Sequence, residues 1–188
     1  PDSNSVVVIT SFTIEAWVNS LNPATGVDQA VVAKRRPEGG TMFALRVTQG
    51  KASLGLNDNQ INFLVASASS QDIQPNRWYH LAATYDGKTA RIYINEALKA
   101  SADVQLQFKA STFPVTIGRE DIPNDPRSFL GLIDEVRVWG RALGPEEIRL
   151  NMWLGLTGQE SDLRGYWNFD AGTATDLTKF HNHGALAG

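Results

Sequence analysis

The feature that most constrains this chain is a two-residue alternation of apolar and polar side chains, repeated in short runs along the sequence. In the first run, residues 12–18, every second position is apolar: Phe12, Ile14, Ala16 and Val18. Because successive side chains of a β-strand point to opposite faces, this pattern predicts a strand with one face in a core. The alternation returns in three further runs, residues 43–47, 52–56 and 104–108.

A hairpin is predicted in the middle of the chain. Asp86-Gly87 separates the run 78–85 from the run 90–94. An Asp-Gly pair between two such runs suits a tight type I′ turn, which needs positive φ at both central positions. Further strands are expected in three later runs, residues 113–118, 132–139 and 164–169. Many short strands joined by Gly-, Asn-, Asp- and Pro-containing turns predict two antiparallel sheets packed face to face.

One segment, residues 144–150, is expected to be a helix. Pro145 would occupy its first position and Glu146 its first turn, where a carboxylate favours the helix dipole. Ile148 and Met152 fall on one face, so the helix should cap one end of the sandwich. The predicted fold is all-β: a two-sheet antiparallel jelly-roll β-sandwich with one short capping helix.

Composition bounds the domain organisation and the partners. The 188 residues are 42% hydrophobic and contain no linker, which predicts one domain over residues 1–188. A net charge of −3 disfavours nucleic acid as a partner, and no apolar run is long enough for membrane insertion. Cysteine is absent, which excludes disulfides and is common in bacterial exported proteins. The start at Pro1 indicates a segment of a longer protein, whose neighbouring domains would be partners.

Five segments carry an ordered set of motifs: Phe-Thr-Ile-Glu-Ala-Trp-Val at 12–18, Trp-Tyr-His-Leu-Ala to Tyr-Asp-Gly at 78–87, Ile-Gly at 117–118, Gly-Leu-Ile-Asp-Glu-Val-Arg-Val-Trp at 131–139, and Gly-Tyr-Trp-Asn-Phe-Asp at 165–170. This set resembles the laminin-G-like jelly-roll family, which belongs to the concanavalin A-like lectin and glucanase superfamily and is related to pentraxins. In many family members the Trp-x-Phe-Asp segment precedes the domain. Here it ends the chain, and we expect it to close the sandwich by pairing with the first strand; the alternative is the start of another repeat.

The resemblance to pentraxins, which hold calcium with an Asp-Asn pair and a later acidic loop, points to a first calcium site. Asp58 and Asn59 would supply the pair, and Glu120 and Asp121 the loop. Ca²⁺ prefers six to eight oxygen ligands of this kind. The alternative is a solvated turn at residues 57–59, with Arg119 and Arg127 neutralising the later acids.

A second, structural calcium site is suggested by the family near the closing segment. Its ligands would be Asp134, Asp176 and Asn182, and the ion would tie the last strand to the body. The alternative treats Asp176 as a turn residue and Asp134 as a partner of Arg137.

Aromatic side chains offer a sugar-binding groove. Trp17, Tyr93, Arg137 and Trp139 fall on the strand faces opposite the expected core. Flat rings stack on the apolar C–H faces of sugars while polar groups bind the hydroxyls. The alternative is that these tryptophans hold the core together.

Catalysis is not expected. The Glu-x-Asp-x-x-Glu pattern of family 16 hydrolases, which share the implied fold, is absent, and the acid pairs Asp134-Glu135 and Glu146-Glu147 are adjacent and therefore diverge. The predicted function is a non-catalytic, calcium-binding recognition module of a secreted or cell-surface bacterial protein, with a glycan as ligand. A protein-interaction, adhesion or spacer domain that binds a cell-surface protein is the alternative, and a glycoside hydrolase or polysaccharide lyase is least favoured.

Overall fold

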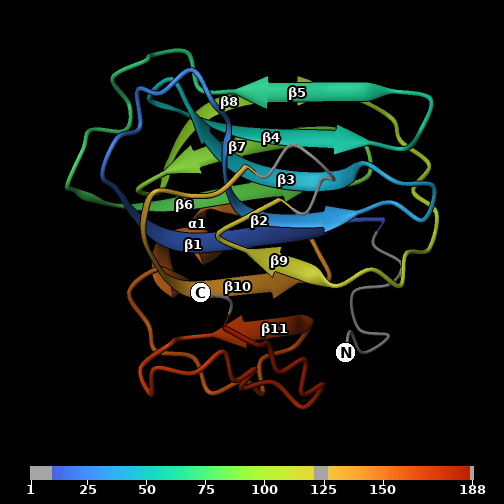
Figure 1. Cartoon of the computed structure of the whole chain (residues 1–188). Coiled ribbons are helices and arrows are strands. Elements are labelled where there is room, and N and C mark those ends of the chain that lie inside the picture. The colour runs from blue at the N-terminus through green and yellow to red at the C-terminus, as the bar shows by residue number, and fades with distance from the viewer. Residues whose placement is uncertain (1–9, 121–126, 187–188) are drawn as a thin grey trace.

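A computed structural model describes residues 10–120 and 127–186, which form two antiparallel sheets packed face to face (Figure 1). The six-stranded sheet, here the large sheet, has the order β11 (Leu163–Trp167), β10 (Gly131–Trp139), β1 (Phe12–Ser20), β6 (Trp78–Tyr85), β7 (Thr89–Ile94) and β8 (Ala97–Asp103). The five-stranded sheet, here the small sheet, has the order β5 (Asn62–Ala66), β4 (Lys51–Asn57), β3 (Thr41–Thr48), β2 (Gln29–Arg35) and β9 (Val115–Ile117). The predicted all-β jelly-roll sandwich is confirmed.

The core lies between the two sheets and is filled by the alternating apolar positions. Phe12 and Ile14 of β1 are fully buried against side chains such as Phe43 and Leu45 of β3. The Phe12 and Phe43 rings lie 5.2 Å apart. Each such side chain contributes about 1.5–3 kcal/mol by leaving water, so the period-2 pattern specifies which face of each strand turns inward.

The predicted hairpin joins β6 to β7. The Asp86 carboxylate accepts the backbone N–H groups of Lys88 (3.0 Å) and Thr89 (2.7 Å) and pairs with Arg91 (2.7 Å). Gly87 has φ +95°, a conformation that glycine adopts without strain. The predicted hairpin is therefore confirmed, but its turn is not type I′: Asp86 lacks positive φ, and four residues separate the paired Tyr85 and Ala90.

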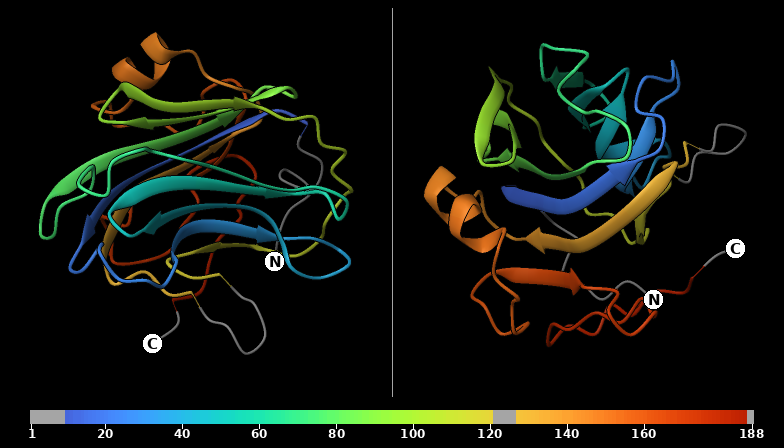
Figure 2. Two further views of the ribbon diagram at one scale, coloured as in Figure 1. Left: turned by 90° about the horizontal axis from the view of Figure 1, so that it is seen from above. Right: turned by 90° about the vertical axis from the view of Figure 1, so that its left-hand side faces the viewer.

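The helix α1 (Pro145–Asn151) lies on the outer face of the large sheet instead of at an end of the sandwich (Figure 2). Glu147 caps it by accepting the Gly144 backbone N–H (2.9 Å), and Arg141 binds the same carboxylate at 2.6 and 2.9 Å. The hydrogen bonds from Arg141, followed by the one from Gly144, lower the pKa of Glu147 to about 2. Within the described ranges no helix is long and apolar enough to cross a membrane.

Besides the position of the helix, two local predictions are wrong. The closing strand β11 pairs with β10 and not with β1, because β1 is already flanked by β10 and β6. Residues 104–108 do not form a strand, although Val104, Leu106 and Phe108 pack on the core. Their backbone N–H groups form hydrogen bonds with side chains instead of a neighbouring strand: Leu106 N–H donates to the Tyr85 hydroxyl (3.1 Å) and Gln107 N–H donates to Asp58 (2.9 Å).

Candidate functional site

The outer face of the large sheet does not hold the predicted groove of Trp17, Tyr93, Arg137 and Trp139. Tyr93, Arg137 and Trp139 are buried, because α1 and its flanking segments cover this part of the sheet. Ile148 of the helix packs in a second apolar cluster with Tyr93 and Trp139. The alternation correctly places all four side chains on the outer face. The prediction that Tyr93, Arg137 and Trp139 are open to a ligand is wrong.

Arg137 anchors the turn that follows α1. Its guanidinium donates to the main-chain carbonyls of Asn151 (2.6 Å) and Leu154 (2.7 Å). The Trp17 indole N–H donates to the carbonyl of Met152 (3.0 Å). These three bonds hold residues 151–154 against the large sheet, so Arg137 positions the surface instead of contacting a ligand.

Three tryptophans gather beside this turn, and we call Trp17, Trp78 and Trp153 the tryptophan platform. Trp153 is 72% exposed, and its ring lies 5.1 Å from that of Trp17 at an angle of 50°. Trp78 is 43% exposed and pairs with Asn19, whereas Trp17 pairs with His80, so Trp78 and Trp17 are diagonal neighbours on the outer face. The platform therefore presents ring surface that the fold leaves in water.

Hydrogen-bonding groups border the platform. Asp134 of β10 lies directly opposite Trp17, and Asn19 continues the same face of β1. Burial above all, with help from the carboxylates of Glu135 and Asp170, raises the pKa of Asp134 above its ordinary value. The Asn19 Oδ1 atom is buried and has no hydrogen-bond partner among the described residues. Ring faces thus stand next to an amide and a carboxyl group.

A buried acid–imidazole pair lies beside Trp17 on the same outer face of the large sheet. The Trp139 indole donates to Glu15 Oε1 (2.6 Å), and Glu15 Oε2 lies 3.4 Å from His80 Nε2. Burial raises the pKa of Glu15 to about 7, although Arg137 and the bond from Trp139 oppose the shift. Burial and then Arg137 lower the pKa of His80 to about 3. The His80 ring, uncharged at neutral pH, packs edge-on at 5.5 Å from Trp17.

The first predicted calcium cluster is not assembled within the described residues. Glu120 is fully buried and accepts two hydrogen bonds from Arg46, at 2.9 and 3.0 Å, and one from Thr41. Arg127 lies 3.6 Å from the same carboxylate. Asp121 lies outside the described residues. Glu120 is therefore paired mainly with Arg46, which the sequence did not indicate, and Arg127 is the arginine named in the alternative that also lies near it.

Asp58 and Asn59 are engaged separately from Glu120. The Asp58 carboxylate accepts three backbone N–H groups, those of Gln60, Ile61 and Gln107. Burial would raise the pKa of Asp58, but these N–H groups outweigh it and hold the pKa below its ordinary value. Asn59 Oδ1 accepts from Arg36 at 2.7 Å. The turn is thus organised by its own backbone.

In the second cluster, Asp176 and Asn182 meet, and Asp134 belongs to the platform border instead. The buried Asp176 carboxylate accepts five hydrogen bonds of 2.8–3.0 Å, from the backbone of Tyr166, Thr178 and Asn182 and from the side chains of Thr178 and Asn182. These donors tie the closing segment to β11. In residues 10–120 and 127–186 no group of three or more His, Asp or Glu side chains could hold a metal ion. Calcium binding stays a prediction.

Neither Trp153 nor Trp78 is among the site residues predicted from the sequence. A signal for Trp153 was present, since it falls off the apolar helix face of Ile148 and Met152. For Trp78 the alternation indicates the outer face of β6, but only the structure shows that α1 leaves this end of the sheet uncovered.

The chain is similar to known proteins in sequence and in structure. The family described as the concanavalin A-like lectin/glucanases superfamily matches residues 1–149. No curated protein sequence matches the chain. A Bacteroides ovatus protein named for inferred carbohydrate binding is similar in structure, with TM-score 0.69 and 23% identity over 89% of this chain and 49% of that one, so this chain spans about half of its length.

Two further structures are similar. The CBM40 of the Ruminococcus gnavus IT-sialidase, bound to α2,3 sialyllactose, has TM-score 0.63 and 16% identity over 77% of this chain and 83% of that one. The heptameric SAP-like pentraxin of Limulus polyphemus has TM-score 0.58 and 18% identity over 75% of this chain and 69% of that one. At these identities the similarity concerns the fold.

Proposed function

This chain belongs to the concanavalin A-like lectin/glucanases superfamily, and we propose that it is a non-catalytic carbohydrate-binding domain whose ligand stacks on the tryptophan platform. The observation that carries the proposal is the exposure of Trp153 and Trp78 beside Trp17. A single exposed indole would need no explanation, but Trp153 is 72% exposed within a cluster of aromatic rings, and a contiguous exposed apolar patch is typical of an interaction site. The carbohydrate-binding names of two similar structures support the same ligand class.

The platform has the chemistry that a sugar ring needs. Indole faces pack against the apolar C–H side of a pyranose, and Asp134, opposite Trp17, lies where ring hydroxyls would meet a hydrogen-bonding group. Because the 151–154 turn is held by Arg137 and Trp17, the Trp153 backbone is ordered before a ligand arrives. Such preorganisation lowers the entropy cost of binding.

The acids around the platform support binding without catalysis. Glu15 is fully buried beside Trp17, where it accepts a hydrogen bond from Trp139, and Glu135 accepts hydrogen bonds from Arg137 (2.5 Å) and Tyr166 (2.9 and 3.0 Å). Glycoside hydrolysis needs two carboxyl groups that both reach the glycosidic bond. We further propose that the domain works in a secreted or cell-surface bacterial protein.

A printed array of neutral and acidic oligosaccharides tests the proposal. The wild-type chain should bind a subset of the neutral, hexose-containing glycans, and Trp153→Ala should lose that binding. For these neutral glycans Leu64→Ala is the matched control, because Leu64 is similarly exposed (62%) but lies on β5 of the small sheet. If no neutral glycan is retained, or if Trp153→Ala binds the neutral glycans as wild type does, the proposal is wrong. New reducing ends in a bound glycan after prolonged incubation would overturn the non-catalytic part.

A further inference from the structure

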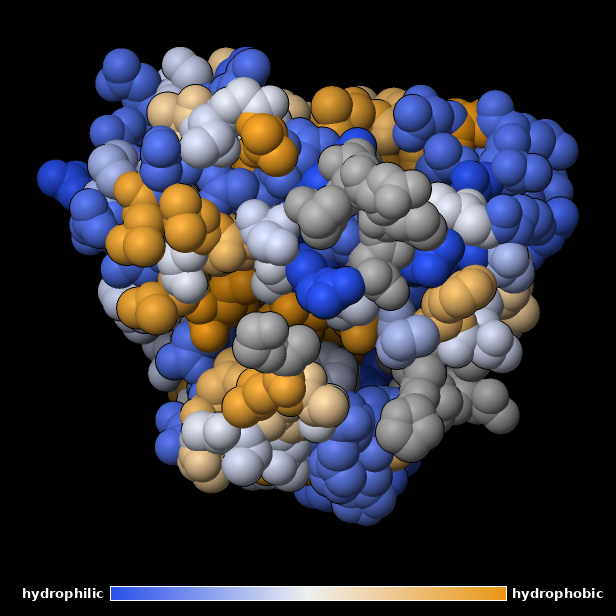
Figure 3. Space-filling view, in the orientation of Figure 1, coloured by the Kyte–Doolittle hydropathy of each residue, from blue (hydrophilic) through white to orange (hydrophobic). Residues whose placement is uncertain are grey.

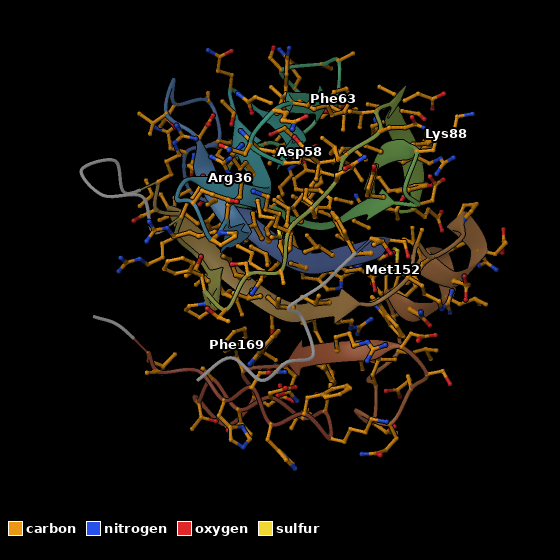
Figure 4. The ribbon with its side chains drawn as sticks, turned by 90° about the vertical axis from the view of Figure 1, so that its right-hand side faces the viewer. Arg36, Asp58, Phe63, Lys88, Met152 and Phe169 are labelled. Atoms are coloured by element: carbon orange, nitrogen blue, oxygen red, sulfur yellow. The ribbon has the colours of Figure 1, made fainter. Side chains whose placement is uncertain are left out.

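A second surface feature lies on the opposite side of the sandwich, in the outer face of the small sheet. A groove of about 530 Å³ runs over β3, β4 and β5. Figure 4 places Arg36, one of its lining residues, on the side of the sandwich opposite Met152, which lies in the turn beside the platform. The two surfaces are therefore separate binding candidates.

The groove concentrates positive charge in a chain whose net charge is −3. Its charged lining residues are four cations and one carboxylate: Arg36, Arg46, Lys51, Arg127 and Asp28. Figure 3 views this face and shows strongly hydrophilic side chains near its centre. Even with the buried Glu120 counted behind the groove, cations exceed anions by four to two. A low-dielectric wall with this excess attracts an anion.

Arg46 is the fixed centre of the groove. It is only 7% exposed, and Nε and Nη2 form a two-pronged pair with the Glu120 carboxylate at 3.0 and 2.9 Å. Asp28 adds a weaker contact at 3.9 Å and is itself paired with Arg127 at 3.1 Å. Buried pairs of this geometry fix the orientation of the guanidinium plane, so its remaining edge is presented without a search for the right rotamer.

Gly55 makes room for that edge. A Cβ atom at this position would lie far inside van der Waals contact of Arg46 Nη1. Gly55 sits in β4 without a positive φ, so glycine is required here for space and not for backbone conformation. Glycine in a strand interior lowers stability because it has no side chain to pack, but here its absence leaves space for Arg46 Nη1 on the floor of the groove.

The rest of the lining suits a sugar acid better than a bare anion. Ser53, Asn57 and Asn62 supply hydroxyl and amide groups, and Phe63 and Leu64 supply apolar surface. We infer that the groove binds the carboxylate or sulfate of an acidic oligosaccharide, with Arg46 as the central contact and Arg36 and Lys51 at its margins. The choice of a glycan as the carrier rests on the proposed function, whereas the need for an anion rests on the groove alone.

Calorimetric titration with tetragalacturonate and with its methyl ester tests the inference, because esterification removes the negative charges. The free acid should bind, and the ester at least roughly tenfold more weakly. The double substitution Arg36→Gln with Lys51→Gln should weaken binding of the acid by roughly tenfold, since it removes two charged contacts at the margin of the groove. Lys88→Gln removes a cation in the β6–β7 turn, away from the groove, and should leave binding unchanged.

The outcomes separate the two proposals. Trp153→Ala should keep its affinity for the acid while losing its binding of neutral glycans. The groove can therefore be tested even if the proposal for the tryptophan platform is wrong. Equal affinity for acid and ester would overturn the inference. So would equal binding of a hexaglutamate peptide, or of sodium sulfate at matched concentration, because either would mean that the groove does not recognise a sugar acid. Arg46→Lys keeps the positive charge opposite Glu120 and should also weaken the binding of tetragalacturonate. Wild-type affinity in a folded Arg46→Lys variant would contradict the central role of Arg46.

Discussion

The buried pair of Glu15 and His80 makes a quantitative prediction about stability and pH. Folded Glu15 keeps its proton up to about pH 7, whereas the unfolded chain releases it near pH 4.5. Between these values the folded state binds more protons, so the Glu15 contribution to stability falls as pH rises. At about 1.4 kcal/mol per pH unit, the fall amounts to about 3 kcal/mol.

His80 has the opposite effect over an overlapping range. The unfolded chain protonates it below about pH 6.5, and the folded chain only near pH 3, so its contribution to stability rises with pH between these values. From pH 4.5 to 6.5 the two contributions oppose each other. The pH dependence of the wild-type free energy of unfolding therefore shows neither contribution separately, and a substitution is needed to measure one of them.

Glu15→Gln removes one of the two contributions while keeping an oxygen to accept the bond from Trp139. The free energy of unfolding of Glu15→Gln minus that of wild type should increase from pH 4.5 to 7 by about 3 kcal/mol, or roughly 6–12 °C in melting temperature. Urea unfolding at a series of pH values measures this difference. Glu146→Gln, an exposed carboxylate on α1, controls for the change in net charge. A difference that stays constant with pH would refute the conclusion that burial keeps Glu15 protonated.

Three further predictions follow from single sites. Asp176→Asn should lower the free energy of unfolding in urea by about 2–4 kcal/mol, because an amide cannot accept all five buried donors; wild-type stability would contradict the role given to Asp176. Gly55→Ala should cost about 1–3 kcal/mol in the same assay by displacing the Arg46 guanidinium, and an unchanged stability would show that Arg46 Nη1 does not occupy the space beside Gly55. The predicted calcium sites require a higher melting temperature in millimolar calcium than in chelator, and equal temperatures would exclude both.

The fold was largely predictable because its determinants are local. The alternation at residues 12–18 and the Asp86-Gly87 turn each specify their own geometry. Strand β2 (Gln29–Arg35) escaped prediction because six of its seven residues are buried, which replaces alternation by a continuous run. The partner of β11 depends on which strand edge is vacant, a property of the assembled sheet and not of the segment.

The candidate site was harder to predict because which side chains α1 covers depends on tertiary packing and not on the local sequence. Tyr93 and Trp139 have the same alternation as Trp17, yet α1 buries the first two and leaves the third partly open. Likewise, nothing near Glu120 in the sequence indicates Arg46, which lies 74 residues away and takes up its carboxylate. Residue type identified plausible chemistry, and packing decided which groups remain available for it.

The most direct test of the account is the dissociation constant for the strongest neutral glycan on the array, measured by calorimetry for wild type, Trp153→Ala and Leu64→Ala. Loss of one stacked ring should weaken binding roughly tenfold, or about 1.4 kcal/mol, in Trp153→Ala. Leu64→Ala should bind as wild type does. If wild type and Trp153→Ala bound with equal affinity while Leu64→Ala bound more weakly, the glycan site would lie on the small sheet. That result would contradict the tryptophan platform as the binding site.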